Sequence, residues 1–252
     1  MKFIAIIPAR YASTRFPGKP LADMNGKPMI QRVYEQVKKC VDKVFVATDD
    51  ERIYDAVTSF GGNVVMTSAN HKSGTDRCAE AYNSIGGGED VIINIQGDEP
   101  FIAPSQIEAI MGCFSDKSVQ IATLVKPFTE NDGIDALINP NSPKVVLGVD
   151  NQALYFSRSV IPFVRGVDMQ EWLKSHTFYK HIGMYAYRAE VLMEITKLPQ
   201  SELEKAESLE QLRWLENGYK IKAGVTNQET IGIDTPDDMQ KALVFMQSIN
   251  RE

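Results

Sequence analysis

The strongest constraint on the fold is a short apolar run at residues 91–95, Val-Ile-Ile-Asn-Ile. Such a run is typical of a strand that is buried on both faces, as the central strands of parallel sheets are. Similar runs recur along the chain and alternate with helical patterns, which predicts an α/β fold with a central, mainly parallel, twisted sheet flanked by helices. The predicted strands are Phe3–Ile7, Val44–Ala47, Val64–Met66, Val91–Ile95, Ile121–Val125, Lys144–Val149, Ala153–Phe156, Met184–Tyr187 and Ile221–Ala223.

Prolines and capping residues mark the expected helix starts. Proline is favourable in the first turn because its missing N–H costs nothing there. Pro28, Pro104 and Pro236 each precede or open an apolar stripe with helical spacing. Ser208 and Gln211 have the spacing of a capping box, which predicts a further helix that ends near Gly218.

The regular alternation is confined to the first part of the chain. Residues 1–125 have the β-α-β-α pattern, whereas residues 126–252 mix strands and loops. We expect one domain, with the second half forming a smaller, irregular lobe on the same sheet.

Composition narrows the class of protein. Of the 252 residues, 43% are hydrophobic, which disfavours a disordered chain. The net charge is −6 and no basic run occurs, which disfavours a nucleic-acid-binding groove. No apolar run reaches the length of a membrane span, so no membrane insertion is expected. Three scattered cysteines, Cys40, Cys78 and Cys113, favour reduced thiols and a cytoplasmic location over a disulfide framework or zinc site.

A basic loop follows the first predicted strand. Residues 8–21 carry Arg10, Arg15 and Lys19 among small residues and a glycine. This loop lies at the carboxyl end of a strand, where open α/β sheets bind ligands, and it can direct cations and backbone N–H groups at a polyphosphate. A solvated basic loop is the alternative. The loop is not a Walker A loop. The chain also lacks a GxGxxG loop, and this absence argues against a dehydrogenase.

Two carboxylates stand at element ends farther along the chain. Asp98 lies in Gln-Gly-Asp-Glu-Pro directly after the most buried predicted strand, and Asp234 lies in Gly-Ile-Asp-Thr-Pro just before the last helix. One or two carboxylates are what Mg²⁺ usually takes from a protein. A plain turn at Asp98 remains open, and Asp237 is better explained by the helix N-terminus, which favours acidic residues.

Six segments occur in one order along the chain: IPARYASTRFPGKPL, QGDEP, YFSRSVIPF, KHIGMYAYR, LEQLRWLENG and GIDTP. Together they resemble the 3-deoxy-manno-octulosonate (Kdo) cytidylyltransferases over essentially the whole chain. The resemblance implies a glycosyltransferase-A-like nucleotidyltransferase that transfers CMP from CTP to the anomeric 2-hydroxyl of Kdo, releases pyrophosphate and activates Kdo for lipopolysaccharide biosynthesis. It also implies Mg²⁺ and a homodimer, with the aromatic-rich segment 150–182 as the expected contact.

The resemblance further implies residue roles. Residues 1–125 would bind the nucleotide, and residues 126–252 the sugar acid and the second subunit. Lys19, Asp98 and Asp234 would be catalytic, the two aspartates as metal ligands. The expected nucleotide-binding residues are Arg10, Ser13, Arg15, Lys19, Arg77 and Gln96, and the expected sugar-binding residues are Arg158, His181, Tyr185, Glu210 and Gln211.

Several alternatives stay open at this point. His181 and Tyr185 could be core residues, Glu210 and Gln211 could serve a helix start, and both tryptophans are expected to pack. Lys180 and Asp76 stand where the family often has arginine and glutamate, respectively, and both keep the charge. The other functions are an acylneuraminate cytidylyltransferase, an enzyme for an 8-amino analogue of Kdo, and a non-catalytic nucleotide-binding module, against which the retained carboxylates argue.

Overall fold

The computed structural model describes residues 1–229 and 232–249. These residues form two compact units, the first made of residues 1–107 with the C-terminal residues from 232 on, and the second of residues 108–229. The unit boundaries differ from the halves expected at 125/126, because residues 108–125 belong to the second unit and the C-terminal segment returns to the first.

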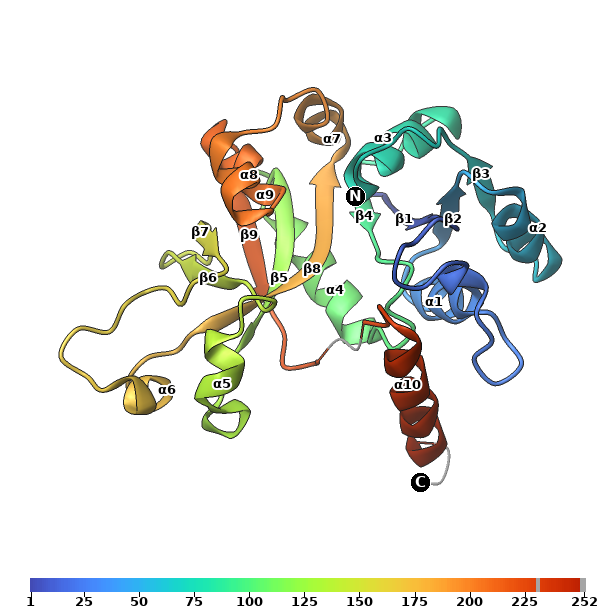
Figure 1. Cartoon of the computed structure of the whole chain (residues 1–252). Coiled ribbons are helices and arrows are strands. Elements are labelled where there is room, and N and C mark those ends of the chain that lie inside the picture. Colours follow the sequence, from blue (N-terminus) through green and yellow to red (C-terminus); the bar gives the residue numbers. More distant parts are fainter. Residues whose placement is uncertain (230–231, 250–252) are drawn as a thin grey trace. The chain divides into compact units, whose positions relative to one another are not determined.

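The first unit is built on a parallel sheet (Figure 1). Its strand order is β3-β2-β1-β4, with pairing of β1 to both β2 and β4. The centre of the sheet is fully buried, from Ile4 to Ile7 in β1 and from Val91 to Ile93 in β4. The predicted parallel α/β sheet is therefore confirmed. The strands are β1 (Phe3–Ala9), β2 (Lys43–Thr48), β3 (Val64–Met66) and β4 (Val91–Asn94).

The helices of this unit begin at capping residues. Asp50 and Ser73 accept hydrogen bonds from the first turns of α2 and α3, and Pro104 and Pro236 open α4 and α10 as predicted. Pro28 is the N-cap of α1 and not its first residue. The helices are α1 (Met29–Lys38), α2 (Glu51–Ser59), α3 (Gly74–Ser84), α4 (Pro104–Gly112, which runs into the second unit) and α10 (Pro236–Ile249).

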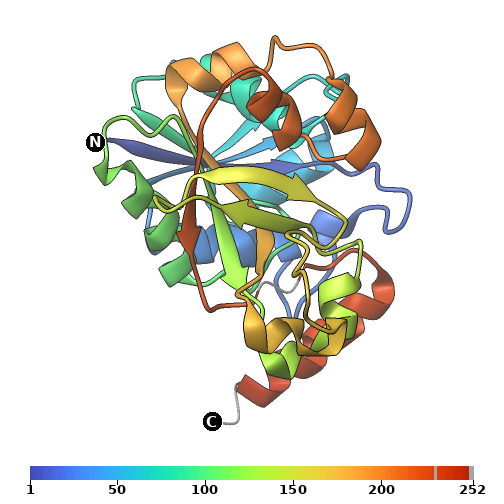
Figure 2. The ribbon, with the colours of Figure 1, turned by 90° about the vertical axis from the view of Figure 1, so that its left-hand side faces the viewer.

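The second unit has a mixed set of strands (Figure 2). β5 (Ile121–Pro127) pairs antiparallel with β8 (Tyr179–Arg188) and parallel with β9 (Ile221–Val225). β6 (Lys144–Leu147) pairs antiparallel with both β7 (Ala153–Ser157) and β8. β8 is much longer than the predicted strand Met184–Tyr187. The prediction missed its first residues because they are only partly buried and do not form an apolar run.

The predicted capping box at Ser208 and Gln211 is wrong. Ser208 has a φ of 51° and ends α8 (Glu202–Glu207), while α9 (Gln211–Glu216) begins after Glu210 without a side-chain cap. The capping box of this region is Ser201 with Glu204. The remaining helices are α5 (Gly133–Ile138), α6 (Trp172–Ser175) and α7 (Ala189–Ile195).

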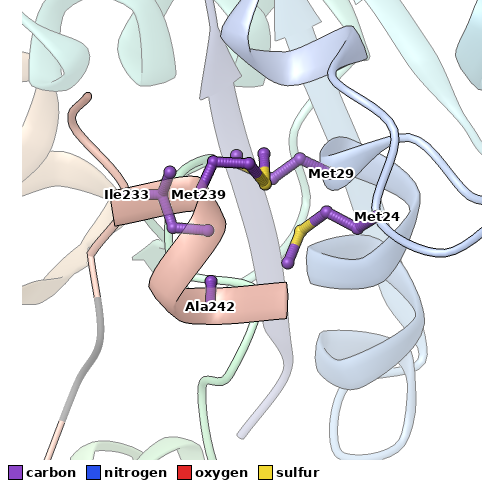
Figure 3. Close-up of a cluster of buried hydrophobic side chains, with 5 residues drawn as sticks. All are labelled: Met24, Met29, Ile233, Met239 and Ala242. Carbon is purple, nitrogen blue, oxygen red and sulfur yellow. The ribbon is translucent and has the colours of Figure 1, made fainter. Parts of the chain in front are cut away.

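A methionine-rich cluster anchors the C-terminal segment within the first unit (Figure 3). Met24, which precedes α1, and Met29, the first residue of α1, pack with Met239 and Ala242 of α10. Ile233, fully buried, belongs to the same cluster and directly precedes Asp234. The packing of α10 therefore fixes where Asp234 lies. No helix among the described residues is long and apolar enough to cross a membrane.

Candidate active site

A cavity of about 320 Å³ lies in the first unit, where the loops after β1 and β4 meet. The strand order turns back between β1 and β4, and ligands of open α/β sheets bind outside the carboxyl ends of the strands at such a point. The cavity is lined by Pro8, Ala9, Arg10, Ser13, Thr14, Arg15, Lys19, Pro20, His71, Lys72, Ser73, Gly74, Arg77, Gln96, Gly97, Asp98 and Asp234. All eight residues predicted for nucleotide and metal binding are among them.

The basic loop is held in shape from inside. Gly18, with a φ of 72°, donates its N–H to the carbonyl of Tyr11 at 2.9 Å and lies so close to the Tyr11 ring that a Cβ there would be 3.0 Å away. The guanidinium of Arg52 in α2 stacks 3.3 Å from the centre of the same ring. This clamp fixes the loop on which Arg10, Arg15 and Lys19 stand.

The loop after β4 approaches β1 at backbone distance. A Cβ on Gly97 would lie 2.9 Å from the carbonyl oxygen of Pro8. Only glycine fits there without a shift of the backbone. The close approach brings Asp98 beside the basic loop.

The two predicted metal-binding carboxylates converge on one cation. The Nζ of Lys19 lies 2.6 Å from Asp98 Oδ2 and 3.3 Å from Asp234 Oδ1. A guanidinium nitrogen of Arg15 lies 3.1 Å from Asp234 Oδ2. The two carboxylate loops are joined directly, because Ile233 N–H donates to the Asp98 carbonyl at 3.0 Å.

Asp238 holds the loop of Asp234 from the helix side. Its Oδ2 accepts from the backbone N–H of Asp234 at 3.2 Å and from the N–H and hydroxyl of Thr235 at 3.0 and 2.8 Å. Asp237 lies in the first turn of α10, where the sequence placed it. The sequence analysis missed Asp238, although a threonine followed three residues later by an acidic residue is itself a capping signal.

The pair of aspartates fits one divalent cation. No group of three or more metal-binding side chains occurs among residues 1–229 and 232–249. Two carboxylates together with water and phosphate oxygens are nevertheless the set that Mg²⁺ takes in phosphate-binding sites. Lys19 already shows that a cation between Asp98 and Asp234 satisfies both.

Glu99, the neighbour of Asp98 in the Gln-Gly-Asp-Glu-Pro segment, is a buried carboxyl. Its Oε2 atom has no hydrogen-bond partner among the described residues. Burial raises the pKa of Glu99 to about 8, and the Asp98 carboxylate adds to the rise. This environment therefore favours a neutral, protonated Glu99 at neutral pH.

Arg77 reaches the cavity from α3 as a fixed, buried cation. One nitrogen of its guanidinium donates to Thr67 Oγ1 at 2.6 Å, and another lies 3.1 Å from Asp49 Oδ2. His71 lines the cavity and contacts Glu80. Lys72 also lines it and was missed, because a single lysine in a loop carries no pattern.

The predicted sugar-binding residues lie in the second unit. The ring of His181 contacts Phe156 edge-on at 5.1 Å between centroids and Tyr185 at 5.4 Å, and one ring nitrogen is 3.0 Å from Thr123 Oγ1. Burial lowers the pKa of His181 to about 3, which favours the neutral ring. Burial also raises the pKa of Tyr185 well above its usual value. Trp214 packs against Tyr185, and Trp172 is buried as well, so both tryptophans are packing residues as predicted.

Arg158 follows β7 and is held by backbone carbonyls. Its Nε donates to Glu207 O at 2.6 Å, and its terminal nitrogens donate to Pro140 O at 2.9 Å and Ser208 O at 3.3 Å. A guanidinium has five N–H groups, so two of them, one on each terminal nitrogen, have no partner among the described residues. Such a pair has the number of donors that one carboxylate accepts.

The last two predicted residues lie at the start of α9. Glu210 Oε1 is 3.1 Å from a guanidinium nitrogen of Arg213. Gln211 is buried, and its Nε2 atom has no hydrogen-bond partner among the described residues. Glu210 is the N-cap residue of α9 but makes no capping hydrogen bond with its side chain, and Gln211 is the first helical residue.

Comparison with known proteins agrees with the fold. A family model described as cytidylyltransferase matches residues 4–221. The chain is 73% identical to a 3-deoxy-manno-octulosonate cytidylyltransferase of Parabacteroides distasonis and 49% identical to one of Thermodesulfovibrio yellowstonii, with 96% or more of this chain covered and at least 97% of each relative. It is also similar to the solved structure of a CMP:2-keto-3-deoxy-manno-octonic acid synthetase complexed with CTP, with 42% identity, a TM-score of 0.90, and coverage of 98% of this chain and 99% of the other.

Proposed function

This chain belongs to the 3-deoxy-manno-octulosonate cytidylyltransferases, within the cytidylyltransferase family, and we propose that it transfers CMP from CTP to the anomeric 2-hydroxyl of Kdo, releases pyrophosphate and so activates Kdo for lipopolysaccharide biosynthesis. The observation that carries the proposal is the cavity in the first unit. There, five basic side chains surround two converging carboxylates, a charge arrangement suited to a triphosphate and a divalent cation.

The nucleotide-binding residues hold the triphosphate and its leaving group. Arg10, Ser13 and Arg15 supply donors along the phosphates, and Arg77 and Gln96 contact the nucleotide. Lys19 neutralises charge on the triphosphate as the bond to pyrophosphate breaks, since a preorganised cation is most useful where charge develops.

The metal in this proposal is Mg²⁺, bound by Asp98 and Asp234. Bound Mg²⁺ would supply charge neutralisation on the phosphates. The chain's own contribution is to keep both carboxylates in place, through Ile233, Asp238 and the methionine-rich cluster.

The sugar-binding residues of the second unit read the sugar acid. Arg158 pairs with its carboxylate through the two N–H groups that remain on its terminal nitrogens. The neutral His181 ring, Tyr185, Glu210 and Gln211 take the hydroxyls, and Gln211 offers a buried Nε2 that lacks a partner within the described chain.

We also propose a cytoplasmic homodimer. Leu154 and Phe163, in the aromatic-rich segment 150–182, are 62% and 73% exposed, and exposed apolar side chains of this size are typical of a subunit contact. Sedimentation of the wild type and of Phe163→Ser tests this: loss of a dimer in the variant is expected, and a monomeric wild type refutes it.

The reaction is tested by pyrophosphate release from CTP and Mg²⁺ with a panel of sugar acids: Kdo, its 8-amino analogue, an acylneuraminate, and no sugar. Turnover with Kdo is expected to exceed that with the others. Arg158→Ala is expected to weaken apparent Kdo affinity by about 10- to 200-fold, the loss of charge-assisted hydrogen bonds, and to leave CTP affinity nearly intact. The control is Arg165→Ala, an exposed arginine. Turnover only with another acid, or equal loss of CTP and Kdo affinity, would contradict the assignment.

A further inference from the structure

Lys144, at the start of β6, is a fully buried cation without a carboxylate partner. Its exposed fraction is 0%. Within the described chain, its ammonium makes no ion pair and donates to two backbone carbonyls, Asn139 O at 3.0 Å and Arg158 O at 2.7 Å. A buried charge held by neutral groups is costly, and an apolar side chain of the same length would fill the space at less cost. Such a residue calls for a reason other than stability.

The position of Lys144 supplies that reason. Its backbone pairs with Ser157 of β7 on one side and with Lys180 of β8 on the other. The residue before it, Pro143, accepts a hydrogen bond from His181 N–H at 2.9 Å. Lys144 therefore lies between the two strand ends that carry Arg158 and His181.

One carboxylate completes this cluster on the side of Arg158. Glu207, at the end of α8, accepts from Ser157 Oγ at 2.6 Å and from Arg158 N–H at 2.9 Å, and its own carbonyl accepts from Arg158 Nε. Arg158 is thus bound at its N–H by Glu207, at its carbonyl by Lys144, and along its guanidinium by three carbonyls. Every polar group of its backbone is fixed from a different element.

The charges do not balance within the cluster. Lys144 and Arg158 contribute two positive charges and Glu207 one negative charge. Burial lowers the pKa of Lys144, the Arg158 charge acts in the same direction, and Glu207 opposes both. Lys144 is buried, and Arg158 and Glu207 are half-buried. A cluster of this kind that carries a net positive charge is suited to an anion, and the carboxylate of a sugar acid is such an anion.

We propose that Lys144 is a positioning residue for the sugar acid: its ammonium fixes the main chain of Arg158 so that the two remaining N–H groups meet the carboxylate. This inference rests on the proposed function. Lys144 does not contact the substrate; it acts through Arg158. Sites held only loosely lose much of their effect, because a displacement of about 1 Å can cost up to 100-fold in rate.

The test is a double-mutant cycle of Lys144→Met and Arg158→Ala, with steady-state pyrophosphate release measured against Kdo and against CTP. Methionine keeps the length of the side chain and removes the ammonium. Lys144→Met is expected to raise KM for Kdo by about tenfold and to change KM for CTP by less than about twofold. In the Arg158→Ala background the same change is expected to add less than about twofold, because residues that act through one another are not additive.

Two further variants separate positioning from stability. Val145→Ala, in the same strand and equally buried, removes packing without touching the ammonium, so it is expected to lower the melting temperature and leave both KM values unchanged. Glu207→Gln weakens the other anchor of Arg158 and is expected to repeat the Kdo-selective loss. It also tests the positioning of Arg158 should Lys144→Met fail to fold.

The outcomes distinguish the two claims. If the increases in KM for Kdo caused by Lys144→Met and Arg158→Ala multiply in the double variant, the inference is wrong but the proposed function stands. The same holds if Val145→Ala reproduces the Kdo-selective increase in KM. The inference also falls if Glu207→Gln changes the two KM values equally. A wild type that releases no pyrophosphate with Kdo overturns the proposed function, and this inference with it.

Discussion

Acid should destabilise the second unit through His181. The ring lies against Phe156 and Tyr185, and burial lowers its pKa to about 3 from an ordinary value of 6.5. In the unfolded chain the ring is solvated and binds a proton near pH 6.5. Over the interval between these two values the unfolded state therefore holds one more proton than the native state.

The sign and size of the effect follow from this difference. Stability rises with pH wherever the unfolded state binds more protons, so the contribution of a neutral His181 is complete above about pH 6.5 and is lost as the pH falls toward about 3. One proton corresponds to about 1.4 kcal/mol per pH unit. At pH 5, about 1.5 units below the unfolded value, the loss should be about 2 kcal/mol.

Urea unfolding between pH 7.5 and 4.5 measures this loss. Both tryptophans of the chain, Trp172 and Trp214, lie in the second unit, so their fluorescence follows that unit. His181→Phe removes the titrating group and keeps a ring against Phe156. The Thr123 hydroxyl can still donate its hydrogen bond to the Met184 carbonyl, at 2.9 Å. The control is His176→Gln, at an exposed histidine.

The comparison is a difference between pH profiles. Other groups also titrate in this range, but they are common to the wild type and to His181→Phe. The wild type should lose about 2 kcal/mol more than His181→Phe between pH 7.5 and 5, and His176→Gln should follow the wild type. Parallel profiles for the wild type and His181→Phe would refute the burial argument.

Three further predictions concern the first unit. Asp98→Asn should abolish most turnover, and excess chelator should stop turnover by the wild type, both measured by pyrophosphate release. Near-full activity in either case contradicts a divalent cation on Asp98 and Asp234. Lys19→Ala should lower kcat by about 100- to 1,000-fold with little change in KM for Kdo; an unchanged kcat with a raised KM would place Lys19 elsewhere. Gly97→Ala puts a Cβ 2.9 Å from the Pro8 carbonyl and should destabilise by about 1–3 kcal/mol in urea unfolding, whereas unchanged stability would mean that the loop yields freely.

Much of the first unit could be predicted because its signals are local. The apolar runs of β1 and β4 are buried on both faces. The rule that ligands bind at the carboxyl ends of parallel strands marked the loop of Lys19 as a ligand-binding loop, and Asp98 was found as a carboxylate at the end of a strand. Asp234 was found as a carboxylate at a helix start. That the chain returns to the first unit to deliver it could not be seen, because nothing in the residues around 230 marks the return.

The second unit was harder to predict because its signals are not local. β8 begins with the partly buried Tyr179, Lys180 and His181, which have no apolar period, so the strand was placed five residues too late. Ser208 looked like a helix cap, yet it adopts a left-handed conformation that ends the preceding helix. Lys144 lies in a predicted strand, but one of its two carbonyl partners, on Arg158, is 14 residues away, and its burial cannot be derived from its sequence neighbours.

The discontinuity of the first unit has a consequence for the making of the protein. Synthesis proceeds from the N-terminus, so a growing chain carries the basic loop and Asp98 long before it carries Asp234 and α10. Until α10 has left the ribosome, Met24 and Met29 lack Met239 and Ala242 as packing partners, and the loop of Asp234 is not held in place. A nascent or prematurely terminated chain that lacks α10 should therefore be unable to turn over CTP. Catalytic activity should begin only when α10 has packed against the first unit.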